Sequence, residues 1–335
     1  MTTQYESNRP DQSTAASNGA GVDSPAKPPV VDPRVHEQPL ISPFVTAGLV
    51  DVFRRRYLLR LLVQKEVSSR YQGSLLGLLW SYVQPLVRFA MYFFVIGLVL
   101  GMHKNVPNFA IHLFSALVAV HFFTETFSNG TRSIVKNKAL VRKMAMPREM
   151  FPVSSCIVSA VNSFPQLLIL FVACLAVGWH PDAQAFLAGF LGIAICTVLG
   201  IALALLFSAM NVFFRDFQNI VQTFQLFTHW IVPMMYPFSK LAESSMHGTW
   251  FYTLYMSNPL TAAVLLVQRC FWVPTSLGEG KGAEHVPADQ AQVGFPIMPD
   301  HLIALGFLML TVSLVILVFC QIAFRRLEGK FAERL

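Results

Sequence analysis

Six stretches of this sequence are apolar over about 20 residues, the length that a helix needs to cross the hydrocarbon core of a bilayer. Because lipid offers no hydrogen bonds to the backbone, a spanning segment of this length folds as a helix that pairs its own polar groups. The composition agrees, since 54% of the residues are hydrophobic and 13% are charged, whereas a soluble domain has about 25% charged residues. The sequence therefore predicts an all-α polytopic membrane protein with six transmembrane helices, at residues 80–101, 109–129, 153–178, 185–210, 218–236 and 302–324.

A seventh apolar stretch, residues 250–273, is interrupted in its middle by Asn258 and Pro259. Proline has no backbone donor and biases the preceding residue away from the helix, so each half of the stretch is too short to cross. We expect two half-helices that re-enter the membrane from one side, between spans five and six. Asn258, Pro259 and Arg269 lie in this stretch, within the segment 237–300. The alternative is a kinked seventh span, which would place the two termini on opposite sides.

Lysine and arginine are concentrated in three segments, and cytoplasmic loops are enriched in these residues. Residues 1–79 hold nine of them, 130–150 hold six and 325–335 hold four, whereas 102–108 holds one. With six spans, both termini then face the cytoplasm and 237–300 faces outward. The formal net charge of +7 is therefore an orientation signal, and no nucleic-acid partner is expected.

The chain divides into four segments around these spans. Residues 1–43 are rich in Pro, Ser, Ala and Asp, and we expect a disordered cytoplasmic tail that is too polar to form a core and lacks the apolar region of a signal peptide. Residues 44–79 should form an interfacial amphipathic helix and the lead into span one, because apolar and basic positions alternate at helical spacing. The apolar positions are Val50, Phe53, Tyr57 and Leu61. The transmembrane domain covers 80–324, and 325–335 form a cytoplasmic C-terminus.

Three ionisable residues lie inside predicted spans: Arg88 in the first, and His121 and Glu125 in the second. Such residues are costly in lipid and usually face protein or a water-filled path. Two interpretations remain open. Arg88 and Glu125 form a structural pair, or these residues handle an anionic substrate.

The connection between spans two and three is longer and more basic than a turn requires. A short helix lying across the membrane, stopped by Pro147 and Pro152, fits its sequence. We expect it to couple the chain to an acidic groove on a soluble partner through Lys136, Lys138, Arg142, Lys143, Pro147 and Arg148.

The sequence lacks the parts of several enzyme classes. It contains no G-x-x-x-x-G-K-[ST] phosphate loop, no HExxH and no G-x-S-x-G. Its five cysteines have no paired spacing, so neither a disulfide framework nor a metal site is indicated. The chain is not expected to be an enzyme, and driven transport would take its energy from a partner or an ion gradient.

Five motifs in this order resemble a known family. They are RYQGSLLGLLWSYVQPL (70–86), KMAMPREMFPVSS (143–155), NVFFRDFQNIVQ (211–222) running into VPMMYP (232–237), SNPLTAAVLLVQR (257–269) and FRRLEGKFAERL (324–335). Together they are similar to the membrane subunit of ABC-2-type polysaccharide exporters, the Wzm-like O-antigen, mycobacterial galactan and teichoic-acid permeases. The tail 1–43 and a polar insertion at 278–297 depart from a minimal member.

The resemblance implies a homodimer in the bacterial inner membrane that exports a lipid-linked glycan on polyprenyl pyrophosphate. Two copies of a separate nucleotide-binding ATPase would bind the cytoplasmic loops and hold ATP and magnesium, with no cofactor on this chain. The resemblance also implies that the two half-helices form an outer gate that includes Asn258, Pro259 and Arg269, within an extracytoplasmic gate region at 237–300. The runner-up is a membrane-embedded lipid-linked sugar transferase, which would need clustered carboxylates or basic phosphate ligands. An ion-coupled carrier would show repeated halves with matching breaks, whereas one interrupted segment occurs.

A glycan has flat C–H faces, so aromatic rings could line its path. The candidate channel-lining residues are Trp80, Tyr82, Phe89, Tyr92, Phe224, Phe227, Trp230 and Tyr236. The alternative is that these rings face lipid or its interface. Span five favours a lining role, because Gln218, Gln222 and Gln225 share its helix and would be costly against lipid.

Overall fold

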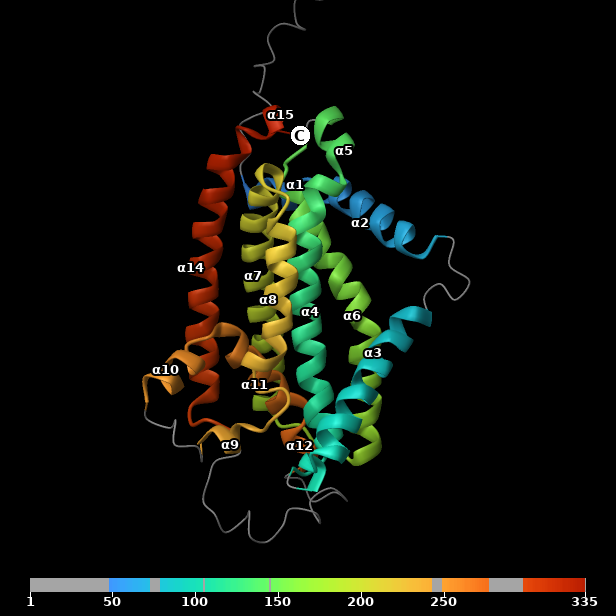
Figure 1. Cartoon of the computed structure of the whole chain (residues 1–335), viewed down its shortest axis with the longest axis vertical. Coiled ribbons are helices and arrows are strands. Elements are labelled where there is room, and N and C mark those ends of the chain that lie inside the picture. Colours follow the sequence, from blue (N-terminus) through green and yellow to red (C-terminus); the bar gives the residue numbers. More distant parts are fainter. Residues whose placement is uncertain are drawn as a thin grey trace, which may run out of the picture. The chain divides into compact units, whose positions relative to one another are not determined.

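The computed structural model describes residues 48–72, 79–104, 106–144, 146–242, 249–276 and 298–334 (Figure 1). The regular elements in these ranges are helices, which confirms the all-α prediction. The predicted tail 1–43 and the insertion 278–297 lie outside the described residues.

Five helices of the described chain are long and apolar enough to cross a membrane. The first is α3 (Trp80–Tyr92), which continues as the π-helix η3 (Phe93–Val99). The others are α4 (Phe109–Lys136), α6 (Met150–Val177), α7 (Ala183–Phe213) and α14 (Leu302–Glu328). Each coincides with a predicted span.

The remaining predicted span, 218–236, is not confirmed. Helix α8 (Phe217–Ile231) has 15 residues, about 22 Å at 1.5 Å per residue, against a hydrocarbon core of about 30 Å. It ends because Val232, which precedes Pro233, takes an extended conformation. The chain then passes through a short irregular stretch to α9 (Phe238–Ala242), so the six-span count remains a proposal.

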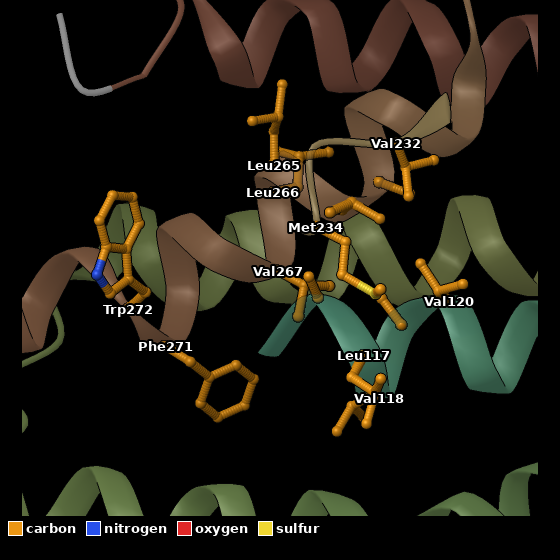
Figure 2. Packing of buried hydrophobic residues seen from close by; sticks show 14 of the residues in the cluster. Leu117, Val118, Val120, Val232, Met234, Leu265, Leu266, Val267, Phe271 and Trp272 are labelled. Carbon is orange, nitrogen blue, oxygen red and sulfur yellow. The ribbon is translucent and has the colours of Figure 1, made fainter. Parts of the chain in front are cut away.

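Helix α4 lies at the centre of the bundle. It is the least apolar of the five long helices, yet 89% of its most apolar window is buried, against 22% for α14. It packs against α6, α7, α8 and α11 (Pro259–Phe271). Figure 2 shows this core, to which α4, α11 and the segment after α8 contribute Leu117, Val118, Val120, Val232, Met234, Leu265, Leu266, Val267, Phe271 and Trp272.

Glycine allows two of these contacts to be close. A Cβ added to Gly130 of α4 would lie 2.3 Å from Cβ of Ala204 on α7. A Cβ added to Gly192 of α7 would lie 2.8 Å from the carbonyl oxygen of Ala263 on α11. Both distances are well below an ordinary carbon contact of about 3.5–4.0 Å. The absence of a side chain at these positions therefore sets the helix separations.

The short helices gather at the two ends of the long ones (Figure 1). At one end, here called the α5 end, lie α1 (Leu49–Arg54), α2 (Arg56–Tyr71), α5 (Lys138–Lys143) and α15 (Phe331–Arg334). At the other, the α11 end, lie α9, α10 (Trp250–Met256), α11, α12 (Val273–Ser276) and the short turn η4 (Met102–Lys104). The three basic segments of the sequence thus share the α5 end in the described chain.

The predicted amphipathic helix is split into α1 and α2 at Arg55, whose backbone leaves the helical region. Leu59 and Leu62 of α2 pack into a core cluster with Phe151, Phe324 and neighbouring residues. The predicted apolar stripe is instead exposed, namely Val50, Phe53, Tyr57 and Leu61. Figure 1 shows α2 running across the direction of the long helices, as an interfacial helix would.

Candidate functional site

A polar cavity of about 220 Å³ opens among α2, α3, α4 and α6, and we call it the Arg88 cavity. Its lining residues are Arg70, Trp80, Ser81, Gln84, Pro85, Arg88, His121, Glu125, Asn162 and Gln166. The structure therefore brings together all three predicted intramembrane polar residues. Since this lining is mostly polar, the cavity is suited to water or a polar ligand.

Glu125 pairs with Arg70 rather than with Arg88. Its Oε1 atom lies 2.5 Å from Nη1 of Arg70 and also accepts a hydrogen bond from Asn162 Nδ2 at 3.0 Å. Arg88 has no hydrogen bond or ion pair with another described residue. The interpretation as an Arg88–Glu125 structural pair is thus wrong, because α2 brings a different arginine to the carboxylate. Arg70 was missed from the sequence because it belongs to the interfacial helix, outside any span.

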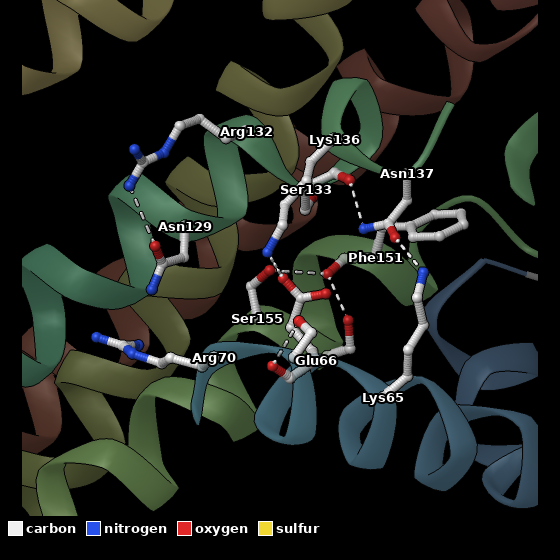
Figure 3. A network of polar contacts seen from close by, with 12 residues as sticks. Lys65, Glu66, Arg70, Asn129, Arg132, Ser133, Lys136, Asn137, Phe151 and Ser155 are labelled. Carbon is white, nitrogen blue, oxygen red and sulfur yellow. Dashed lines mark hydrogen bonds and ion pairs between the residues drawn. The ribbon is translucent and has the colours of Figure 1, made fainter. Parts of the chain in front are cut away.

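A second cavity of about 550 Å³, the α2–α4 groove, adjoins the first and shares Arg70 with it. Figure 3 shows the polar contacts beside it, which join α2 to the last turns of α4. Lys136 forms an ion pair with Glu66, and Lys65 Nζ donates to Asn137 Oδ1 at 3.0 Å. Lys136, predicted as a coupling residue, is therefore used in holding α2 against α4.

Helix α5 presents a basic face at the end of the bundle. Leu140 and Val141 pack against the core cluster at the α5 end, while Lys138, Arg142 and Lys143 are exposed. Lys138 and Arg142 are four residues apart and so share one face of the helix. None of the three basic side chains has a hydrogen bond or an ion pair with another described residue. Their charges are available to a partner.

Arg148 and Pro147 lie inside the structure. Arg148 Nη1 donates to the carbonyl oxygen of Glu328 at 2.6 Å, and its guanidinium lies 5.5 Å from the ring centroid of Phe331. Pro147 is buried, and its carbonyl oxygen accepts from Met150 N at 3.2 Å. Arg148 thus anchors the C-terminal helices, and Lys136, although exposed, is paired with Glu66. This leaves Lys138, Arg142 and Lys143 as the exposed cations without an ion pair among the predicted coupling residues.

Helix α8 packs along one narrow face and exposes most of its surface. Val221 and Thr228 are buried, and Gln225 Nε2 donates to the carbonyl oxygen of Thr124 on α4 at 2.6 Å. The predicted lining rings of α8 are exposed: Phe224, whose ring also meets that of Phe127 on α4, by 47%, Phe227 by 59% and Trp230 by 67%. A helix with exposed glutamine and aromatic side chains together suits a partly polar surface better than lipid alone.

The predicted lining residues outside α8 have different surroundings. Phe89 packs inside the chain against Phe114, with ring centroids 5.0 Å apart. Tyr92 lies 6.4 Å from the ring of His229 on α8, and Tyr236 shares a hydrogen bond of 3.1 Å with Tyr255 on α10. Trp80 lines the Arg88 cavity and Tyr82 is half-buried.

The break at Asn258 and Pro259 separates α10 from α11 as predicted. Asn258 Oδ1 accepts from Leu260 N at 3.0 Å, and Pro259 occupies the first turn of α11, where a missing N–H costs nothing. With seven and 13 residues, both helices are too short to span. Helix α11 is buried almost throughout, so it packs within the bundle and is not an exposed surface helix.

Arg269 fastens α11 to the start of α7. Its Nη2 atom lies 2.9 Å from Oδ2 of Asp182, which also caps α7 by accepting from Ala185 N. Partial burial opposes ionisation of Asp182, but the hydrogen bonds and charge of Arg269 prevail and lower the pKa of Asp182 below its ordinary 3.8. This contact joins the predicted gate to a spanning helix.

The sequence matches the family described as ABC-2 type transporter over residues 57–272, from α2 to the end of α11. It is 28% identical to the O-antigen export system permease protein RfbA of Myxococcus xanthus over 66% of this chain and 83% of that protein. It is 27% identical to an RfbA of Klebsiella pneumoniae, over 62% of this chain and 77% of that protein. It is 20% identical to the polysialic acid transport protein KpsM of Escherichia coli, over 64% of this chain and 81% of that protein. The matched region holds the Arg88 cavity, α5, α8 and α11, and with its five long apolar helices this multi-pass membrane protein belongs to the ABC-2 type transporter family.

Proposed function

We propose that the chain is the membrane-spanning permease subunit of an ABC transporter that exports a polyprenyl-pyrophosphate-linked polysaccharide of the O-antigen or galactan class. It acts as a homodimer in the bacterial inner membrane, with its termini in the cytoplasm. Two copies of a separate ATPase, which hold ATP and magnesium, bind at the α5 end. The relatives named O-antigen export system permease proteins support the O-antigen class, and the one named a polysialic acid transport protein supports a polysaccharide as the substrate.

The observation that carries the proposal is the exposed basic face of α5 in a chain of this family. It lies at the end of the bundle opposite α11 (Figure 1), together with the other basic segments, as the positive-inside rule requires of a cytoplasmic end. Since α5 follows α4 directly, a force on α5 acts on the central helix of the bundle. That connection suits a coupling element.

The sugar-transferase alternative is not favoured, because the matched family and the named relatives are transport proteins. The Arg88 cavity also offers one carboxylate, Glu125, and that group is already held by Arg70 and Asn162.

Charge reversal on α5 tests the proposed coupling. Replacing Arg142 and Lys143 by Glu should abolish co-purification of the ATPase, because like charges would then face its acidic groove. Lys330→Glu is the matched control, since Lys330 is also exposed and directly precedes α15, which lies at the α5 end (Figure 1), but is outside α5. The control variant should keep both the ATPase and the stimulated hydrolysis.

Export itself is measured in cells that lack the native gene. We expect lipid-linked glycan to accumulate on the cytoplasmic side, and the wild-type chain to restore its appearance at the surface. The α5 variant should insert normally and fail to restore it. Surface glycan in the deletion strain, or full export by the α5 variant, would contradict the proposal.

A further inference from the structure

The charge of Arg88 is not balanced within the described residues. Arg70 and Arg88 both line the Arg88 cavity, and Glu125 is the one carboxylate among its lining residues. Glu125 is engaged by Arg70, so at least one net positive charge remains, and it resides on Arg88. Arg88 lies eight residues into α3, about 12 Å along the helix axis. A cation at such a position in a spanning helix marks a functional path rather than a lipid-facing surface.

The space beside Arg88 admits a small polar ligand. Its volume of about 220 Å³ corresponds to roughly seven waters at about 30 Å³ each. The acceptor Oε1 of Glu125 is occupied by Arg70 and Asn162, whereas the guanidinium of Arg88 has donors to spare. A guanidinium binds phosphate oxygens through two parallel hydrogen bonds, which gives both strength and geometric selectivity.

The positive surface continues toward the α5 end. Arg70 lines both the Arg88 cavity and the α2–α4 groove. Further along the groove, Arg132 donates to Ser128 and Asn129 and has no carboxylate partner among the described residues. Arg132, Arg70 and Arg88 thus follow one another from the α2–α4 groove to the Arg88 cavity. Such an arrangement attracts anions electrostatically.

We propose that the Arg88 cavity binds a phosphate-bearing lipid head group, with Arg88 as its main ligand. The pyrophosphate of a polyprenyl-linked glycan and the phosphate of an anionic phospholipid offer the same chemistry. The assignment of the cavity to the pyrophosphate of a polyprenyl-linked glycan rests on the proposed function. The proposal that the cavity binds a phosphate head group does not.

The test measures binding to the purified full-length chain in detergent, by native mass spectrometry. Farnesyl pyrophosphate, dioleoyl phosphatidylglycerol and inorganic pyrophosphate are the probes. Arg88→Gln should weaken binding of the lipid probe about ten-fold or more, since it removes a charge-assisted contact. Arg88→Lys keeps the charge but not the two-pronged geometry and should retain part of the affinity. Arg215→Gln, an exposed site between α7 and α8, should bind as wild type does.

A second variant covers the case in which Arg88→Gln fails to fold. Gln84 lines the cavity one turn before Arg88, so Gln84→Glu would supply a carboxylate to that arginine. It should weaken binding by a similar factor without removing the guanidinium.

The three probes identify the source of the head group. Tighter binding of farnesyl pyrophosphate than of phosphatidylglycerol assigns the cavity to the exported class, and equal binding assigns it to membrane phospholipid. Binding of all three probes that is unchanged by both Arg88→Gln and Gln84→Glu overturns the proposal, as does binding of inorganic pyrophosphate alone. Because the assay contains no ATPase, a failure of the coupling or export experiments leaves its result unaffected.

Discussion

Gly130 sets the distance between the two most extensively packed helices, and adding one methyl group there tests how rigid that contact is. In Gly130→Ala the new Cβ would lie 2.3 Å from Cβ of Ala204 and 3.3 Å from its Cα. Carbon atoms in contact are about 3.5–4.0 Å apart, so α4 and α7 must separate locally by more than about 1 Å. Ala204 is fully buried and has no flexible end that could move aside. Overpacking of this kind costs about 1–3 kcal/mol.

Moving the methyl group from one helix to the other isolates this clash. The double variant Gly130→Ala, Ala204→Gly keeps one alanine and one glycine in the pair, so the helix propensities of the two exchanges nearly cancel. The closest remaining contact is then the 3.3 Å between the new Cβ and Cα of residue 204. We expect the double variant to recover much of the lost stability, with a coupling free energy of about 1–3 kcal/mol.

These free energies are measured by unfolding each variant in the same detergent while monitoring the helical circular dichroism signal. Gly329→Ala is the control, since a Cβ there would meet no atom within 4 Å, and it should unfold as wild type does. The reasoning is refuted if Gly130→Ala is as stable as the control. It is also refuted if the double variant is no more stable than the single one.

Three further predictions concern the orientation of the chain in the membrane, the proposed glycan channel and the contact between Asp182 and Arg269. All five native cysteines are buried, so an impermeant maleimide should label only introduced, exposed cysteines. It should label Ser257→Cys from outside and Ala139→Cys only from inside, and the reverse pattern would show the opposite orientation. If Trp230 borders a closed channel, Trp230→Ala should raise ATP turnover without export, whereas normal export and a sealed membrane would place this ring against lipid. Asp182→Ala should lower the free energy of unfolding by about 1 kcal/mol through loss of the α7 cap, and Asp182→Asn, which keeps the cap, by less. Since the pKa of Asp182 is lowered in the folded chain, the stability from its contact with Arg269 is present at neutral pH and is lost as the pH falls below about 4. Equal melting of wild type and Asp182→Asn at neutral pH would refute that contribution.

Local features of the sequence determined the secondary structure and where most helices begin and end. Apolar runs of spanning length predicted the five long helices, because a backbone in lipid must satisfy its own hydrogen bonds. The pair Asn258 and Pro259 predicted the break before α11 for an equally local reason, since proline cannot donate a backbone hydrogen bond. A proline also explains why the predicted fifth span is not confirmed, because Pro233 lies inside it and α8 stops at Ile231.

Partners distant in sequence were decided only by the tertiary structure. Glu125 binds Arg70, 55 residues away, and Arg148 binds the backbone of Glu328, 180 residues away. No periodicity encodes such pairs, because they depend on which faces of separate helices meet. The central position of α4 in the bundle was likewise decided only by the tertiary structure. Its polar residues showed that part of it avoids lipid, but only the packing of α6, α7, α8 and α11 around it buries the helix. The cavity that holds Arg88 forms where α2, α3 and α6 meet it.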